Sequence, residues 1–280
     1  MEQYDILIIG GGAAGISAAK AAKGRVLLVD RKPRLGGVLL QCAHRGFGNH
    51  LTGPEYTAEL LEDFPGDITL ALETTVLSVT KEKTALLAGG HTGRREVSFS
   101  QLILATGCRE IPMGALPIAG SRPEGIYTAG EMQEWMNLHG FIPEGPAVIL
   151  GSGDLGLIMA KHLAEKNIPV TLVEQKDACG GMVRNQKALQ PYPVNILTGD
   201  TVIKTHGEKI LSGCTTKKGV YLPCKTLLIA VGLTPEQELV AHLGDVPWLH
   251  LCGNCHRVQP MVEAVAQEGR LAGITAGGNL

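Results

Sequence analysis

The chain has 280 residues, 44% of them hydrophobic and 4% aromatic, with a formal net charge of −2. This composition allows one large or two modest cores, with two domains the better expectation, and the interspersed acids and bases exclude a basic surface for nucleic acid or an anionic membrane. The longest apolar runs are strand-sized, far below the roughly 20 residues of a membrane span, so we expect no membrane insertion.

The first strand is expected within a few residues of Met1. No basic segment followed by an apolar stretch precedes it, so the sequence predicts no secretory signal and a cytoplasmic protein. The seven cysteines are an odd number and are scattered along the chain. They fit small buried side chains in a reducing compartment better than a disulfide scaffold.

Residues 5–9, 15–23 and 25–30 predict a strand, an alanine-rich helix and a second strand. The turn between the first strand and the helix (residues 10–15, GGGAAG) fits the dinucleotide-binding pattern GxGxxG, and Asp30 follows about 20 residues later. Gly10 permits the tight turn and Gly12 leaves room for a diphosphate at the helix N-terminus. Asp30 would accept hydrogen bonds from a ribose; the alternative is a purely structural turn.

Short strands are next expected at residues 68–71, 76–79, 84–88 and 96–99, which would form an antiparallel meander. A buried strand at 101–105 then ends in Thr106 and Gly107. The Pro- and Gly-rich stretch at 111–125 is interpreted as a linker that contains the first hinge between two domains.

The strand–helix–strand unit recurs at residues 147–150, 156–166 and 170–174, with the turn at 151–156 (GSGDLG) and an acid at Glu174. Two such units predict two dinucleotides. The carboxylate of Glu174 would repel the 2′-phosphate of NADP and bind the free ribose of NAD, so NAD is favoured. The positive charge of Lys176 nearby leaves NADP as an alternative.

The second domain is expected to end near residue 247, because a strand at 249–251 and an amphipathic helix at 259–272 have no partner sheet nearby in the sequence. They most simply rejoin the first domain. The predicted fold class is therefore α/β, with two Rossmann-like (three-layer ββα) dinucleotide-binding domains. The first comprises residues 1–111 and 248–280, and the second, residues 112–247, is inserted into it.

With the two glycine turns, residues 105–107 (ATG) and 230–235 (AVGLTP) resemble motifs of the two-dinucleotide-domain flavoproteins, the pyridine nucleotide-disulfide oxidoreductase superfamily. The resemblance implies FAD in the first domain, NAD(H) in the second, with NADP(H) less favoured, and an enzyme. Residues 251–254 (LCGN) stand where that family carries Ala-Gly-Asp, whose acid binds the flavin ribityl chain. Asn254 replaces the acid, and its amide can still hydrogen-bond hydroxyls.

A closer resemblance lies in residues 36–42 (GGVLLQC), 51–56 (LTGPEY), 107–110 (GCRE) and 127–130 (YTAG). These look like bacterial FAD-dependent accessory subunits of dehydrogenases for glycerol 3-phosphate, opines and proline. The resemblance implies a partner, either a second flavoprotein dehydrogenase subunit or an electron-carrier protein. Larger members continue with an interface or iron–sulfur domain, so we expect a minimal member that does not dimerise through one.

The cysteines disfavour a disulfide reductase. The stretch directly after residues 36–37 contains only Cys42, not the pair of cysteines spaced five apart that such enzymes carry, and the second domain has no Cys-x-x-Cys after its helix. Cys42 and His44 are nevertheless candidates for a catalytic pair that faces the flavin; otherwise, the loop only hydrogen-bonds the cofactor. Cys252 and Cys255 overlap the ribityl turn and either pack beside the cofactor or form a redox pair. Neighbouring histidines on a strand and turn rarely converge on one ion, so no metal is predicted.

FAD and NAD(H) together suit hydride exchange between nicotinamide and flavin, with electrons passed to or from a partner protein or a small substrate. The alternatives are a self-sufficient NADH oxidase or small-molecule reductase, and a non-catalytic dinucleotide-binding module. The residues expected to bind the first cofactor are Gly10, Gly12, Ala13, Ala14, Gly15, Asp30, Arg31, Gly37, Gln41, Ala105, Thr106, Gly107, Gly253 and Asn254. Those expected to bind the second are Gly151, Gly153, Asp154, Leu155, Glu174 and Gly232.

Overall fold

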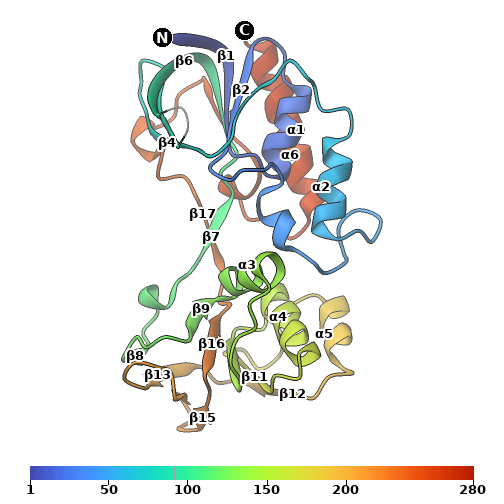
Figure 1. The fold of residues 1–280 in the computed structure, drawn as a ribbon, viewed down its shortest axis with the longest axis vertical. Helices are drawn as coiled ribbons and strands as arrows, with labels where there is room; N and C mark the ends of the chain where they lie inside the picture. The colour runs from blue at the N-terminus through green and yellow to red at the C-terminus, as the bar shows by residue number, and fades with distance from the viewer. Residues whose placement is uncertain (91–92) are drawn as a thin grey trace. The chain divides into compact units, whose positions relative to one another are not determined.

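A computed structural model describes residues 1–90 and 93–280 and divides the chain into two compact units (Figure 1). Unit 1 comprises Met1–Arg109 and Thr234–Leu280, and unit 2 comprises Glu110–Leu233. Unit 2 is thus inserted into unit 1, and both are built on parallel sheets with helices. The expected α/β class with two such units is confirmed.

The main sheet of unit 1 has the strand order β3-β2-β1-β6-β5-β4, with β18 also pairing with β6. The strands are β1 (Glu2–Ile9), β2 (Val26–Val29), β3 (Thr69–Ala71), β4 (Thr74–Val79), β5 (Thr84–Gly89), β6 (Gly93–Leu104) and β18 (Leu249–Leu251). The fully buried β2 and the buried ends of β1 and β6 form the parallel centre, as expected for strands covered on both faces.

Two strand expectations were wrong in detail. β3 pairs in parallel with β2 and does not belong to the antiparallel meander, which consists of β4, β5 and the first half of β6. Residues 96–99 and 101–105, expected as separate strands, lie in the single long strand β6 up to Leu104. The physical reason is that β1 pairs in parallel with β6 from Val97 to Leu104, so no turn interrupts it.

The α-helices described in unit 1 are α1 (Ala13–Ala21), α2 (Gly53–Leu61) and α6 (Val262–Gly278). Helices α1 and α6 pack on the sheet, and α2 packs on α1. Figure 1 shows α6 beside α1, and glycines let their backbones meet. A Cβ on Gly269 would lie 2.1 Å from the Ala14 carbonyl oxygen, and one on Gly273 would lie 2.3 Å from that of Ala18. Helix α6 begins at Val262 and ends at Gly278, both later than in the expected helix at 259–272. The contact of its glycines with α1 explains why the helix continues beyond residue 272.

The returning segment after unit 2 joins the core of unit 1 earlier than expected. Val240, Leu243 and Trp248 are buried in a cluster with the sheet, and the Trp248 and Phe99 rings lie 5.6 Å apart. Residues 234–247 consequently belong to unit 1, and the expected boundary at 247/248 is corrected to 233/234. The first crossing, expected at 111/112, lies at 109/110.

The parallel sheet of unit 2 has the order β12-β11-β10-β16-β9. Its strands are β9 (Ile126–Thr128), β10 (Ala147–Leu150), β11 (Val170–Glu174), β12 (Val194–Thr198) and β16 (Thr226–Ile229). The helices of this unit are α3 (Ala129–His139), α4 (Asp154–Glu165) and α5 (Val183–Leu189). A second sheet has the order β15-β14-β13-β8 and contains β8 (Ala119–Gly120), β13 (Val202–His206), β14 (Gly213–Thr216) and β15 (Tyr221–Pro223).

The stretch at 111–125 is not a free linker. It contains η2 (Met113–Ala115) and β8, and the side chains of Met113 and Ile118 are buried in a core of unit 2. The chain crosses between units through β7 (Cys108–Glu110) and β17 (Leu233–Pro235), which pair as a two-stranded sheet. In the described part of the chain, no helix has both the length and the apolar character to cross a bilayer.

Candidate dinucleotide-binding sites

The first glycine turn joins β1 to α1, and its glycines have different physical roles. Gly10 has a φ of +106°, and a Cβ there would lie 2.3 Å from the Ala105 carbonyl oxygen. A Cβ on Gly15 would lie 1.8 Å from the Gly10 carbonyl oxygen, so both positions require glycine for packing. Gly12, the N-cap of α1, instead faces open space. This leaves room for an anion at the helix N-terminus.

Asp30 lies at the end of β2 and is held beside this turn. One carboxylate oxygen accepts from the Gly11 N–H at 2.5 Å, and the other accepts from the Lys32 N–H at 2.7 Å. The loop that follows Asp30 returns to the turn, because the Gly36 N–H donates to the Gly11 carbonyl at 2.8 Å. A Cβ on Gly37 would lie 3.1 Å from the Gly12 Cα. The structure thus brings Asp30 and Gly37 together with the glycine turn, while Arg31 is exposed.

Segments distant in sequence meet at the head of α1. The Ala105 N–H donates to the Ile9 carbonyl at 2.8 Å, which places residues 105–107 next to the turn. Gly107 has a φ of +77° and an open side, whereas the Thr106 hydroxyl donates to the Glu236 carbonyl at 2.6 Å. Thr106 therefore anchors the returning chain.

The turn at 253–254 approaches the same helix end. Gly253 has a φ of +68°, and a Cβ there would lie 2.8 Å from the Ala14 Cβ. The side-chain oxygen of Asn254 accepts from the Gln259 N–H at 2.9 Å. This turn and the first glycine turn, separated by most of the chain, therefore lie side by side.

The candidate catalytic pair lies in the loop after η1 (Gly37–Gln41). Cys42 is buried, its thiol donates to the Val38 carbonyl at 3.3 Å, and burial raises its pKa to about 12. The half-buried His44 ring lies 5.1 Å from the Phe47 ring, and Gln41 is buried. A thiol held in the protonated form is a poor nucleophile, which favours a packing role for Cys42.

The second glycine turn repeats the first in unit 2. Gly151 has a φ of +105°, and a Cβ there would lie 2.4 Å from the Ala230 carbonyl oxygen. A Cβ on Gly156 would lie 2.1 Å from the Gly151 carbonyl oxygen, while Gly153, the N-cap of α4, faces open space. These three glycines therefore have the same roles as Gly10, Gly15 and Gly12.

The other candidates in unit 2 have contacts of their own. One Asp154 oxygen accepts from the Met182 N–H and the Asn185 side chain, both at 2.7 Å, which directs its charge toward this loop. The Leu155 side chain packs on the core, so only its backbone belongs to the turn. Gly232 has a φ of +146° and accepts from the Ile111 N–H at 3.1 Å.

Glu174 ends β11 and matches Asp30. One carboxylate oxygen accepts from the Ser152 N–H at 2.9 Å and the Ser152 hydroxyl at 2.5 Å, and the other accepts from the Lys176 N–H at 2.8 Å. Burial acts to raise the pKa of Glu174, but these hydrogen bonds outweigh it and leave the pKa below its ordinary value. A negative charge is therefore maintained at the end of this strand.

Sequence reasoning missed the glycine pair of unit 2. The Gly180 N–H donates to the Ser152 hydroxyl at 2.9 Å, and the Gly181 N–H donates to the Ser152 carbonyl at 2.8 Å. The pair begins six residues after Glu174, as residues 36–37 begin six after Asp30. Comparison of the two segments (DRKPRLGG and EQKDACGG) would have found it.

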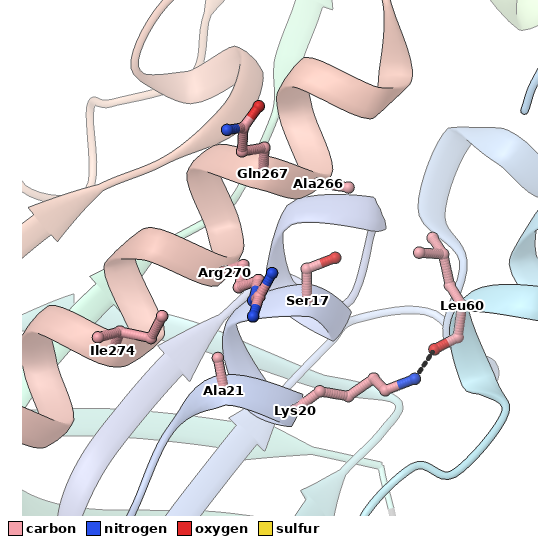
Figure 2. Close-up of a pocket in the computed structure, with 8 residues that line it drawn as sticks. All are labelled: Ser17, Lys20, Ala21, Leu60, Ala266, Gln267, Arg270 and Ile274. Carbon is pink, nitrogen blue, oxygen red and sulfur yellow. Dashed lines mark hydrogen bonds between the residues drawn. The ribbon is translucent and has the colours of Figure 1, made fainter.

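A separate groove of about 660 Å³ lies on the helices of unit 1 (Figure 2). The Lys20 ammonium spans to the end of α2, donating to the Leu60 carbonyl at 3.1 Å and to the Glu62 carbonyl. The groove is lined by Ser17, Lys20, Ala21, Leu60, Ala266, Gln267, Arg270 and Ile274. None of the candidate cofactor residues lines it.

The two glycine turns, each with a fixed acid and open helix N-terminus, are accompanied by a match of residues 4–248 to the pyridine nucleotide-disulphide oxidoreductase family. The chain belongs to this family. Its members bind FAD and a pyridine nucleotide. The open sides of Gly12 and Gly153 and the carboxylates of Asp30 and Glu174 fit the diphosphate and ribose of such cofactors.

Similar family members include an opine oxidase subunit of Agrobacterium tumefaciens (strain Ach5), which is 34% identical over 88% of the chain and 56% of its own length. Hydrogen cyanide synthase subunit HcnB of Pseudomonas protegens is 31% identical over 85% of the chain and 58% of its own length. The chain therefore spans just over half the length of these curated relatives. Thioredoxin reductase from T. acidophilum has the same fold, with a TM-score of 0.81, 17% identity, and coverage of 100% of this chain and 99% of that one.

The Cys-x-x-Cys of this family member is enclosed in the core of unit 1. Cys252 and Cys255 are buried, and the Cys255 thiol donates to the Leu104 carbonyl at 2.9 Å. Burial raises the pKa of both thiols, which favours packing over thiol exchange. Among residues 1–90 and 93–280, no three His, Cys, Asp or Glu side chains gather in a group suited to a metal ion.

Proposed function

We propose that this chain is an FAD-dependent oxidoreductase in which unit 1 holds FAD, unit 2 holds NAD(H), and electrons pass to or from a partner. The observation that carries this proposal is the repetition of one cradle in both units. In each unit, the third residue of the glycine turn, Gly12 or Gly153, faces open space at a helix N-terminus. A carboxylate at the end of the next strand accepts a hydrogen bond from the N–H of the second turn residue: Asp30 accepts from Gly11, and Glu174 accepts from Ser152.

In unit 1, the N–H groups at the start of α1 would bind the diphosphate, since they lie at the positive end of a helix. Asp30 would accept hydrogen bonds from the adenosine ribose. Gly107 and the turn at 253–254 would contact the flavin side, because they adjoin the glycine turn. When bound, FAD supplies the capacity to exchange hydride with a nicotinamide, and this chain supplies the orientation.

In unit 2, the state of Glu174 supports NAD over NADP. Its buried carboxylate is kept ionised by Ser152 and the Lys176 backbone, so a 2′-phosphate beside it would be repelled. The free hydroxyls of an NAD ribose would instead donate to it. The Lys176 side chain is exposed and adds a positive charge nearby, but the Lys176 backbone N–H donates a hydrogen bond to the Glu174 carboxylate.

A second protein is the proposed electron partner. Two relatives are named as subunits, one of opine oxidase and the other, HcnB, of hydrogen cyanide synthase, which supports a role as one subunit of a larger redox enzyme. The raised pKa of Cys42 argues against an oxidase that depends on this thiolate. A second flavoprotein dehydrogenase subunit or an electron carrier therefore remains the favoured partner.

Anaerobic stopped-flow absorbance of the purified protein tests this proposal. We expect the visible flavin band to bleach rapidly on mixing with NADH and much more slowly with NADPH. Faster bleaching with NADPH would reject the NAD assignment alone. A flavin-containing protein that neither nucleotide reduces would reject unit 2 as a hydride-donor site. A protein that binds no flavin would reject the whole proposal.

A further inference from the structure

Glu268, on the second turn of α6, has contacts that no glycine motif predicts. One of its carboxylate oxygens accepts from the Gly253 N–H at 2.8 Å, and the other accepts from the Gln259 side-chain amide at 3.1 Å. The His256 imidazole nitrogen lies 3.6 Å from the second oxygen. A single carboxylate on α6 therefore connects both ends of the turn at residues 253–259.

This turn needs an external acceptor because of its backbone conformation. Gly253 is left-handed, with a φ of +68°, and is pressed against Ala14 at the head of α1. Its N–H does not continue the pairing of β18 with β6, which ends at Leu251 and Leu104. Glu268 provides the acceptor from the neighbouring helix, and a hydrogen bond to a charged carboxylate is stronger than one to a neutral group.

The hydrogen bonds continue from Glu268 to Asn254. Glu268 holds the Gln259 side chain, and the Gln259 N–H donates to the side-chain oxygen of Asn254 at 2.9 Å. Because an amide presents oxygen and nitrogen at opposite ends, this bond orients the Asn254 NH2 group away from Gln259. Asn254 would then act toward a ligand as a hydrogen-bond donor.

We propose that Glu268 is the positioning residue of the flavin-binding turn, orienting Gly253 and Asn254 toward the FAD held at the head of α1. This inference rests on the proposed function of unit 1. Glu268 acts through the turn, while Asn254 donates from its NH2 group to an oxygen of the cofactor.

The test compares FAD release from wild-type, Glu268→Ala and Glu268→Gln holoproteins, followed by the recovery of free-flavin fluorescence after dilution. Loss of a hydrogen bond to a charged group predicts release about tenfold faster or more in Glu268→Ala. Glu268→Gln should recover part of the retention, because its amide oxygen can still accept from Gly253. The flavin absorbance spectrum should change in both variants, which a purely structural role would not produce.

Glu263→Gln is the matched control on the same helix. Its carboxylate also accepts a backbone N–H, from Gly48 at 2.9 Å, but lies outside the turn. It should release FAD at the wild-type rate.

The pair Glu268→Ala and Gln259→Ala provides a second criterion. If both residues position one turn, the double variant should release FAD less rapidly than the product of the single effects predicts. Multiplying effects, or wild-type retention and spectra in both Glu268 variants, would overturn the inference while leaving flavin binding intact. A wild-type protein that carries no FAD would instead overturn the proposed function of unit 1, and this inference with it.

Discussion

Gly10 and Gly12 lie two residues apart but constrain different properties of the molecule. Gly10 has a left-handed backbone conformation, and a side chain there would collide with the Ala105 carbonyl. A side chain at Gly12 would instead point into open space. The first glycine is required for folding and the second for room beside the helix. The GGGAAG pattern predicted both roles, because the requirement is local to one strand–turn–helix unit.

Alanine substitutions should separate these roles. Gly10→Ala should destabilise unit 1 by about 1–3 kcal/mol or more, because a Cβ collides with backbone. Gly12→Ala should keep the unfolding midpoint of the FAD-free protein but lose bound FAD. Chemical unfolding and the flavin-to-protein absorbance ratio measure the two properties. An FAD-free Gly12→Ala protein that unfolds as readily as Gly10→Ala would contradict the division.

Glu174 should set the preference between the two pyridine nucleotides. Replacing it with alanine removes both the ribose acceptor and the repulsion of a 2′-phosphate. We expect kcat/KM for NADH to fall about tenfold, from loss of hydrogen bonds to a charged group, while that for NADPH falls less or rises. Glu208→Ala, an exposed acid elsewhere in unit 2, should leave the ratio unchanged. An unaltered ratio in Glu174→Ala would assign specificity elsewhere.

Cys42 predicts a loss of stability in alkaline solution. Burial raises the pKa of its thiol in the folded protein to about 12, above its ordinary value of 9.0, so the folded state binds this proton more tightly. Its contribution is fully present below pH 9 and is lost as the pH rises toward 12. Cys42→Ala should make the unfolding free energy less dependent on pH in this window, as followed by urea unfolding. An equal slope in both proteins would refute the assignment.

The burial of Cys42 and the raised pKa of its thiol could not be predicted from the sequence. Its loop sequence resembles a flavin-facing segment, which suggested a catalytic thiol. Burial of the side chain depends on how residues 37–53 fold onto α1 and α2, and no local pattern encodes that packing.

At the scale of elements, strand and helix types followed from periodicity, while their ends depended on tertiary partners. The buried runs of β1, β2, β10 and β11 were predicted because they are short and apolar. The continuity of β6 was not, since polar residues in its first half suggested a break that pairing with β1 and β5 bridges. The start of α6 was placed early because Asn254 and Glu268 hold residues 253–259 in a turn.

The contact between α1 and α6 predicts a sharp difference among the glycines of α6. Gly269→Ala should lower the unfolding free energy of unit 1 by about 1–3 kcal/mol or more, because its Cβ would meet the Ala14 carbonyl. Gly278→Ala meets no atom within 4 Å and should be neutral or stabilising by up to about 1 kcal/mol, as alanine favours helix. Thermal unfolding compares them; equal midpoints would show that the helices separate at little cost.

At the scale of the whole molecule, sequence predicted two units and the insertion of one into the other, since the glycine turn occurs twice and the last strand and helix lack local partners. It misplaced the second crossing because residues 234–247 show no strong periodicity. Their membership in unit 1 depends on where Val240, Leu243 and Trp248 are buried.

Two units with separate cores should respond separately to their ligands. We expect calorimetry to resolve two unfolding transitions, with FAD raising one and NAD⁺ raising the other. A ligand at 100 times its Kd adds about 2.7 kcal/mol to the unit that binds it. Gly153→Val should abolish the NAD⁺ response and preserve that to FAD. One transition shifted equally by both ligands would contradict independent sites.

The contact of α6 with α1 also sets an order of events during synthesis. Ala14 and Ala18 emerge from the ribosome early, but the glycines that cover them follow the whole of unit 2. At about 5–20 residues per second, this interval is on the order of ten seconds or more. Unit 2 can fold while α1 still lacks its cover. The turn at residues 253–254, which lies against Ala14, also follows unit 2. The complete cradle proposed for FAD would consequently form only at the end of synthesis.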